Sequence, residues 1–271
     1  MAGVSSESLK AALQELEAKL PTASLSLAEE LFGVLGLLDS NAGLRRALTD
    51  PSRDSKEKAD MFGRLLEGKV SADARDIVTS LAASRWASAR DIGDALETLA
   101  ATTAVAVAEN KGQGVDGLEG LESDLFAFNR IVGSDHDLQR ALVEPQASDE
   151  AKTALALQLV PGAGPAAQLL IRQAVSAPRG IKPTALVERF VQLVAKRQQR
   201  WIAEVNVTRP LTSEQATRLQ AGLDRLYGRA LKMNVNVDPR LVGGVRVMVG
   251  DEVVDASVIS RLAELRRSLT V

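Results

Sequence analysis

Leu27-Ala-Glu-Glu-Leu31-Phe32 returns 94 residues later as Leu121-Glu-Ser-Asp-Leu125-Phe126, and Leu44-Arg-Arg46-Ala47-Leu48 returns as Leu138-Gln-Arg140-Ala141-Leu142. The match keeps one register without a gap, with 18 identities in 77 aligned positions. Similarity that holds one register over such a length points to a duplicated folding unit. We therefore predict two helical units of like design, which favours a protein that holds partners over one that performs chemistry.

The two copies carry the same helix signals at matching positions. Leucines spaced three and four residues apart predict an amphipathic helix at the start of each copy, and a short helix follows it up to Pro51 or Pro145. Asp54 and Ser148 occupy one register, and both side chains can cap a helix start. Two further helices complete each copy, and the identical pairs include Lys58 with Lys152 and Arg85 with Arg179.

The segments around the first copy complete the helical part of the chain. Leu9, Leu13, Leu16 and Leu20 form one stripe of a helix that we expect to end at Pro21, outside the repeat. Between the copies, residues 111–117 contain three glycines, which is typical of a joint. We read this segment as a domain boundary.

The periodicity changes after residue 203. Alternating residues predict strands at 205–207, 233–237 and 245–249, and Thr212 with Gln215 forms a capping box ahead of a helix to about Tyr227. Residues 250–252 read as a turn, and Asp255 or Ser257 as the cap of a last helix. That helix would carry an apolar face formed by Val258, Leu262, Leu265 and Leu269.

These patterns predict a mainly α fold: two tandem helical-bundle units followed by a small α+β C-terminal domain. The expected boundaries are residues 1–112, 113–203 and 204–271. Hydrophobic residues make up 45% of the chain, enough for a packed core, and aromatic residues only 3%. An Ala- and Leu-rich chain with few aromatic residues favours helices over strands.

Composition excludes several classes of function. The three predicted domains carry 13 basic and 17 acidic, 10 and 10, and 10 and 8 residues, so none has the basic excess typical of nucleic-acid binding. The chain contains no cysteine, which excludes disulfides and thiolate metal sites. The N-terminus lacks the pattern of a secretory signal, and no apolar run reaches the roughly 20 residues that span a bilayer. We expect no direct insertion into a membrane.

Four features suggest catalysis or ligand binding, but an ordinary structural role explains each of them better. His136, the only histidine, lies in a polar turn without a second metal ligand, and residues 161–165 lack the lysine and the preceding strand of a phosphate loop. Gly243-Gly244 suggests a backbone bend, and the basic run Lys196–Trp201 suggests a solvated helix face with the tryptophan buried at its end. No catalytic constellation, cofactor site or metal cluster can be assembled.

The most specific stretch is Val235-Asn-Val-Asp-Pro-Arg-Leu-Val-Gly-Gly-Val-Arg-Val-Met-Val-Gly-Asp251, followed by Val254-Asp-Ala-Ser257. It resembles the C-terminal signature of the delta subunit of the rotary ATP synthase, the bacterial counterpart of the oligomycin-sensitivity-conferring protein. Pro210-Leu-Thr-Ser-Glu-Gln215 fits the same family. Removing one 94-residue unit from 271 residues leaves 177, about the usual length of the short form. The chain thus resembles the long form of actinobacterial relatives, with one extra helical unit.

The resemblance implies a mechanical role without catalysis. Members of this family hold N-terminal segments of the alpha subunits in a groove of the helical domain and hold the C-terminal region of the b stalk subunit through their C-terminal part. They act as a stator that stops the catalytic head from turning with the rotor. By resemblance we expect one copy per complex, at the cytoplasmic face of the cell membrane, as a peripheral part of the ATP synthase.

The same resemblance suggests partner-binding residues. In this family, the groove that holds the alpha-subunit segment lies between the first and fifth helices of the helical domain. In the first copy, the corresponding residues are Leu9, Leu13, Ile77 and Leu81. In the second copy Ile171 and Val175 correspond to the last two. The C-terminal stripe of Leu262, Leu265 and Leu269 is the candidate for stalk contact. Ordinary core packing is the competing explanation for every one of these residues.

Two other functions stay open at this point. A generic helical-repeat adaptor for amphipathic peptide segments would explain the duplication, although two copies are fewer than the three or more that solenoids generally need. An enzyme confined to the α+β tail would need an acid, a base or a nucleophile that the sequence does not supply.

Overall fold

The computed structural model describes residues 3–112, 114–228, 231–238, 241, 244–250 and 252–255. Contacts divide the chain into two compact units, Met1–Val194 and Ala195–Val271, which we describe separately. The first unit is helical, and the second combines a sheet with one long helix in its described part. The expected mainly α fold with a C-terminal α+β part is confirmed. The finer division at residues 112 and 203 stays a prediction.

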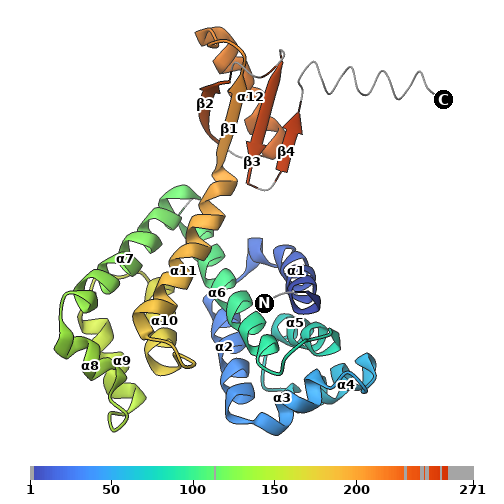
Figure 1. Cartoon of the computed structure of the whole chain (residues 1–271), viewed down its shortest axis with the longest axis vertical. Coiled ribbons are helices and arrows are strands. Elements are labelled where there is room, and N and C mark those ends of the chain that lie inside the picture. The colour runs from blue at the N-terminus through green and yellow to red at the C-terminus, as the bar shows by residue number, and fades with distance from the viewer. Residues whose placement is uncertain are drawn as a thin grey trace. The chain divides into compact units, whose positions relative to one another are not determined.

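The helices of the first unit repeat in order and in spacing along the sequence, and Figure 1 labels each of them. Both bounds of α8 lie 94 residues after those of α3, and the other pairs begin at closely matching positions. The first copy contains α1 Val4–Glu17, a short 3₁₀ turn Leu20–Thr22, α2 Leu25–Ser40, α3 Ala42–Thr49, α4 Ser55–Leu66, α5 Ala72–Ala83 and α6 Asp91–Lys111. The second contains α7 Val115–Gly133, α8 His136–Val143, α9 Asp149–Gln158, α10 Pro165–Ser176 and α11 Pro183–Gln198.

Different residues perform the same capping role in the two copies. The carboxylate of Asp54 accepts the backbone N–H of Lys56 at 2.8 Å at the start of α4, and the hydroxyl of Ser148 accepts that of Ala151 at 3.2 Å at the start of α9. Both predicted caps are confirmed. Each satisfies backbone donors that the first helical turn leaves without a partner.

The first helix is shorter than its leucine stripe predicts. Helix α1 ends at Glu17, and Leu20 lies in the following 3₁₀ turn, where Pro21 occupies an early position that tolerates its missing N–H. Leu16 and Leu20 are buried, whereas Leu9 and Leu13 are half-buried. The leucine stripe is therefore buried at its C-terminal end, and its leucines on the earlier turns of α1 are partly exposed.

Helix α6 lies between the two copies. It packs against α1 and α2 of the first copy and against α7 and α10 of the second. An amphipathic surface helix would leave one side exposed, but residues 103–107 of α6 are all buried. Five consecutive residues exceed one helical turn, so this stretch is covered on every side. Small residues such as Ala104 and Ala106 let the neighbouring helices approach it closely.

The corner between α6 and α7 is closed by two glycines. A Cβ on Gly117 would overlap the carbonyl oxygen of Ala108 and would lie 2.8 Å from the Cα of Gly112. A Cβ on Gly112 would likewise overlap the Cα of Gly117. Because the obstructing atoms are backbone, no side-chain rotation can make room. Gly112 and Gly117 thus lie at a close-packed corner.

The second unit contains a four-stranded sheet in the order β2-β1-β3-β4. A short 3₁₀ turn, Gln199–Trp201, leads into the strands, which are β1 Ile202–Val207, β2 Lys232–Val237, β3 Val245–Val249 and β4 Glu252–Asp255. Strands β1 and β2 are parallel and are joined through α12 Ser213–Tyr227, whereas β3 is antiparallel to both of its neighbours. Parallel neighbours require such a crossover connection.

Helix α12 covers one face of this sheet (Figure 1). Leu223 of the helix packs with Val205 and Val247 of the strands in one apolar cluster. The predicted capping box is confirmed: the backbone N–H of Thr212 donates to Gln215 Oε1 at 2.9 Å, and that of Gln215 donates to the Thr212 hydroxyl at 3.3 Å. The cap sets the start of the helix that completes this small core.

The end of the tail differs from the sequence-based expectation in one place. We expected Glu252 in a turn and Asp255 or Ser257 as a helix cap, but Glu252–Asp255 form β4, which pairs with β3. The two consecutive valines in this strand favour extended backbone. Gly244 has φ +88°, which agrees with the expected bend before β3, and Gly243 lies outside the described residues. The predicted last helix also lies outside the described residues.

Candidate functional site

The face shared by α1 and α5 contains the first set of predicted partner-binding residues. The two helices pack against each other. Leu9 and Leu13 on α1 are half-buried, whereas Ile77 and Leu81 on α5 are 5% and 1% exposed. The structure therefore brings the four residues onto one pair of helices, with the remaining apolar surface on the α1 side.

Polar contacts fasten α1 and the turn after it to α5 and the loop that follows α5. Lys19 Nζ lies 2.5 Å from a carboxylate oxygen of Asp73, and the Ser80 hydroxyl donates to Glu15 at 2.6 Å. At the other end, the Ser8 hydroxyl donates to the backbone carbonyl of Arg85 at 2.7 Å. The hydrogen bond to Asp73 is the main reason that the pKa of Lys19 is raised. These contacts fix how the two helices lie against each other.

The corresponding face of the second copy lies between α6 and α10, and its side chains are buried. Ile171 and Val175 on α10 are 0% and 2% exposed. Helix α6 packs against α10, and Thr103 and Val107 of α6 lie 94 positions after Leu9 and Leu13. Both of these α6 residues are buried. Helix α6 thus takes the place of a first helix in the second copy, although the sequence repeat itself does not include that helix.

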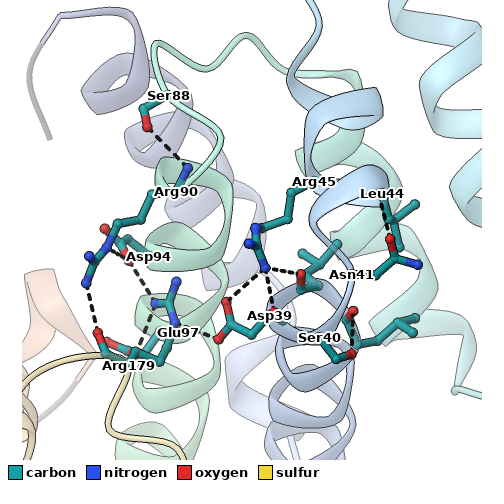
Figure 2. Close-up of polar contacts among 12 residues, drawn as sticks. Asp39, Ser40, Asn41, Leu44, Arg45, Ser88, Arg90, Asp94, Glu97 and Arg179 are labelled. Carbon is teal, nitrogen blue, oxygen red and sulfur yellow. Dashed lines mark hydrogen bonds and ion pairs between the residues drawn. The ribbon is translucent and has the colours of Figure 1, made fainter.

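The two copies are also joined by a buried arginine. Arg179, in the loop after α10, reaches into the first copy, where its guanidinium lies 2.7 Å from Asp39, 2.8 Å from Asp94 and 3.3 Å from Glu97 (Figure 2). Its side chain is 10% exposed. Arg90 donates to the carbonyl oxygen of Arg179 at 2.9 Å. We call Arg179 with these three carboxylates the arginine cluster.

Burial and the neighbouring charges shift the pKa values of two members of the arginine cluster, Glu97 and Arg179. Burial raises the pKa of Glu97, and Arg179 opposes that rise. For Arg179, burial lowers the pKa, but the carboxylates of Asp39, Glu97 and Asp94 together raise it above its ordinary value. A buried guanidinium needs such partners, because an unpaired buried charge is strongly unfavourable.

Sequence reasoning missed the arginine cluster. The repeat pairs Arg179 with Arg85, but no local spacing connects residue 179 with residues 39, 94 and 97. Gly93 is a further part of the arrangement, because a Cβ there would lie 2.5 Å from Arg179 Nη2. A glycine inside a helical pattern is the one signal in the sequence that a neighbouring group approaches closely at this place.

The other residues that suggested chemistry in the sequence lie at ordinary positions of the fold. His136 is exposed at the first position of α8, and residues 161–165 connect α9 to α10, where the N–H of Gly164 donates to Asp124 at 2.8 Å. Lys196 is exposed, and Trp201 is half-buried rather than buried. Over the described ranges, no group of acidic or histidine side chains could hold a metal ion, and no helix is long and apolar enough to cross a membrane.

A family model described as the ATP synthase delta (OSCP) subunit matches residues 101–269, which is more than half of the chain. The chain belongs to the ATP synthase delta (OSCP) subunit family. The match begins inside α6 and runs through the second copy into the tail. It therefore covers the part of α6 that takes the place of a first helix beside α10.

Relatives in the delta (OSCP) family match the whole chain. ATP synthase subunit delta of Pseudarthrobacter chlorophenolicus is 68% identical, and that of Arthrobacter sp. strain FB24 is 66% identical, each over 99% of both chains. The same subunit of Streptomyces griseus is 40% identical over 99% of both chains. These actinobacterial relatives therefore match both copies of the helical unit as well as the tail.

A chain in the structure of the Toxoplasma gondii mitochondrial ATP synthase hexamer is 17% identical, with a TM-score of 0.32 over 63% of this chain and 97% of its own. That likeness is too low to support an argument. Family membership is sufficient for the general conclusion: the chain is a structural, non-catalytic delta subunit of the ATP synthase.

Proposed function

We propose that the chain is the stator subunit that links the alpha/beta catalytic head of the ATP synthase to the b stalk. In this role it keeps the head from turning with the rotor, so that torque from proton flow is converted into ATP synthesis in other subunits. It acts as a single copy at the cytoplasmic face of the cell membrane, as a peripheral part of the complex. The full-length similarity to ATP synthase delta subunits carries the proposal.

The two copies divide the work in this proposal. The family model begins at residue 101, which favours the second copy, with α6 as its first helix, as the equivalent of the single helical domain of the short form. The first copy is then the added unit. Its α1–α5 face keeps half-buried leucines, whereas the equivalent face between α6 and α10 is covered. This difference favours the first copy as the receiver of an alpha-subunit segment.

An amphipathic helix is the natural occupant of the α1–α5 face. Such helices bind by laying their apolar side into a groove between helices. Leu9 and Leu13 supply the apolar contact, and the polar contacts between α1 and α5 hold the two helices in place. The b stalk subunit is assigned to the tail, through Leu262, Leu265 and Leu269, which lie outside the described residues.

Replacing Leu9 and Leu13 together with glutamine is expected to weaken binding of an alpha-subunit N-terminal peptide about tenfold or more, because two apolar contacts are lost. Fluorescence anisotropy of the labelled peptide with the full-length chain measures this. Leu65→Gln is the matched control, since Leu65 is a leucine on α4 that is 39% exposed and belongs to neither helix of the face. Equal weakening by both variants, or none by the double variant, contradicts the assignment to this face.

The proposed function itself is tested by binding to the complex. ATP synthase heads stripped of their delta subunit, together with the b subunit, should bind the full-length chain in sedimentation. A generic helical-repeat adaptor would bind unrelated amphipathic helices equally well. Failure to bind heads in the presence of the b subunit would refute the stator proposal.

A further inference from the structure

Within the described part of the chain, Lys58 is a buried cation without a carboxylate at ion-pair distance. The residue is 4% exposed, and its ammonium donates one hydrogen bond, at 3.2 Å, to the backbone carbonyl of Ser84. Burial lowers the pKa of Lys58, the positive charge of Arg85 lowers it further, and Asp50 and Asp54 oppose both. A buried charge in this situation is costly unless a counter-ion is supplied.

Lys58 lines a pocket of about 330 Å³ in which positive charge prevails. Two other cationic side chains, Arg53 and Arg85, line the same pocket, and Trp86 contributes an apolar wall. The carboxylate of Asp54 is the one acidic group among the lining residues, and it accepts backbone N–H groups at the start of α4.

The neighbouring carboxylate of Asp50 is also engaged. It accepts the hydroxyl and the N–H of Ser52, and it lies 3.9 Å from the guanidinium of Arg53. Arg53 is thus already partly balanced, whereas Lys58 and Arg85 have no ion pair among the described residues. These two cations are the groups that a ligand could still pair with.

In the second copy, the arginine that corresponds to Arg85 is paired with carboxylates. Lys58 and Arg85 correspond to Lys152 and Arg179, which are identical residues in the repeat. Arg179 obtains its carboxylates from helices outside its own copy, namely Asp39 on α2 and the pair on α6 (Figure 2). Carboxylates from helices outside its own copy thus pair with Arg179. At Arg85, its counterpart in the repeat, the described residues supply no carboxylate.

We propose that the pocket at Lys58, Arg85 and Trp86 is a docking site for carboxylate side chains on an acidic helical segment of a partner protein. The positive charge and the apolar wall together fit a glutamate or aspartate on a helix. The arginine cluster provides the precedent, since Asp94 and Glu97 lie three residues apart on α6. This site is distinct from the α1–α5 leucine face and does not depend on the stator role.

The test uses a synthetic, capped alanine-based helical peptide with two glutamates three residues apart. Fluorescence of Trp86 in a full-length Trp201→Phe background reports occupancy of the pocket. Binding is expected to saturate and to weaken about tenfold or more when glutamine replaces both glutamates, since charged hydrogen bonds are lost. Lys58→Met and Arg85→Gln are each expected to weaken it by about as much.

Lys152→Met is the matched control, because Lys152 is the repeat counterpart of Lys58 but does not line this pocket. It should bind the peptide like the parent chain. Lys58→Met should also raise the melting temperature, because it removes an uncompensated buried charge. If Lys58→Met fails to fold, Arg85→Gln still decides the question, since Arg85 is exposed. Unchanged binding in Arg85→Gln, equal binding of the glutamine peptide, or tighter binding of inorganic phosphate than of the peptide overturns the proposal.

Discussion

Gly117→Ala is expected to destabilise the first unit by about 3 kcal/mol or more, the range of severe steric conflicts. The added Cβ would overlap the carbonyl oxygen of Ala108 and would lie 2.8 Å from the Cα of Gly112. Helices α6 and α7 would have to separate to admit it, and α6 packs against both copies. Chemical denaturation of the full-length chain, followed by circular dichroism, measures the loss.

Gly120→Ala is the control for this prediction. Gly120 lies in the same helix, and a Cβ there would meet nothing within 4 Å. Alanine in an open helix position is expected to stabilise by about 0.5–1 kcal/mol. If Gly117→Ala were as stable as Gly120→Ala, helices α6 and α7 could not meet at the close corner described above.

Arg179→Gln is expected to cost about 2 kcal/mol at neutral pH, less than the roughly 3–5 kcal/mol of a fully buried pair, because solvent screens the partly exposed Asp39 and Asp94. Arg179 also has φ +53°, an unusual conformation for a residue other than glycine. Thermal unfolding of the variant measures the loss.

The loss in Arg179→Gln should shrink as the pH falls from about 7 towards 5. Burial already raises the pKa of Glu97, and the guanidinium of Arg179 opposes this rise most strongly, with a smaller contribution from Arg189. Without Arg179 the folded-state pKa of Glu97 rises further above its unfolded value, so the variant gains more stability than the parent chain as the pH decreases. Arg140→Gln, at an arginine whose side chain is 76% exposed, is the control and should change little. A loss that is independent of pH would contradict the account of the arginine cluster.

The local elements were easier to predict from the sequence than their assembly. Leucine spacing, the two prolines and the capping residues Asp54, Ser148 and Thr212 locate the helices, because these signals act within a few residues. The dual packing of α6 could not be predicted this way, since it depends on helices far apart in the sequence. The strand β4 was missed because the turn at residues 250–252 was read as leading to a helix cap, whereas a two-residue connection between two strands is also a local signal of a β-hairpin.

The candidate site was predicted only in part. The repeat and the family resemblance indicate α1, α5 and α10, but periodicity cannot tell a core leucine from one that receives a partner. The structure shows only a difference in exposure: Leu9 and Leu13 keep exposed surface, whereas the four candidates on α5 and α10 are buried. The arginine cluster and the pocket at Lys58 depend on the fold bringing distant charges together, which no spacing rule in one sequence reveals.

The most direct test of the stator role is proton-driven ATP synthesis. Inverted membrane vesicles whose ATP synthase lacks this subunit should synthesise little ATP, and addition of the full-length chain should restore synthesis. The Gly120→Ala variant should restore it as well. Full synthesis without the chain, or no recovery when the folded chain is added to vesicles that retain the head and the b subunit, would contradict the account.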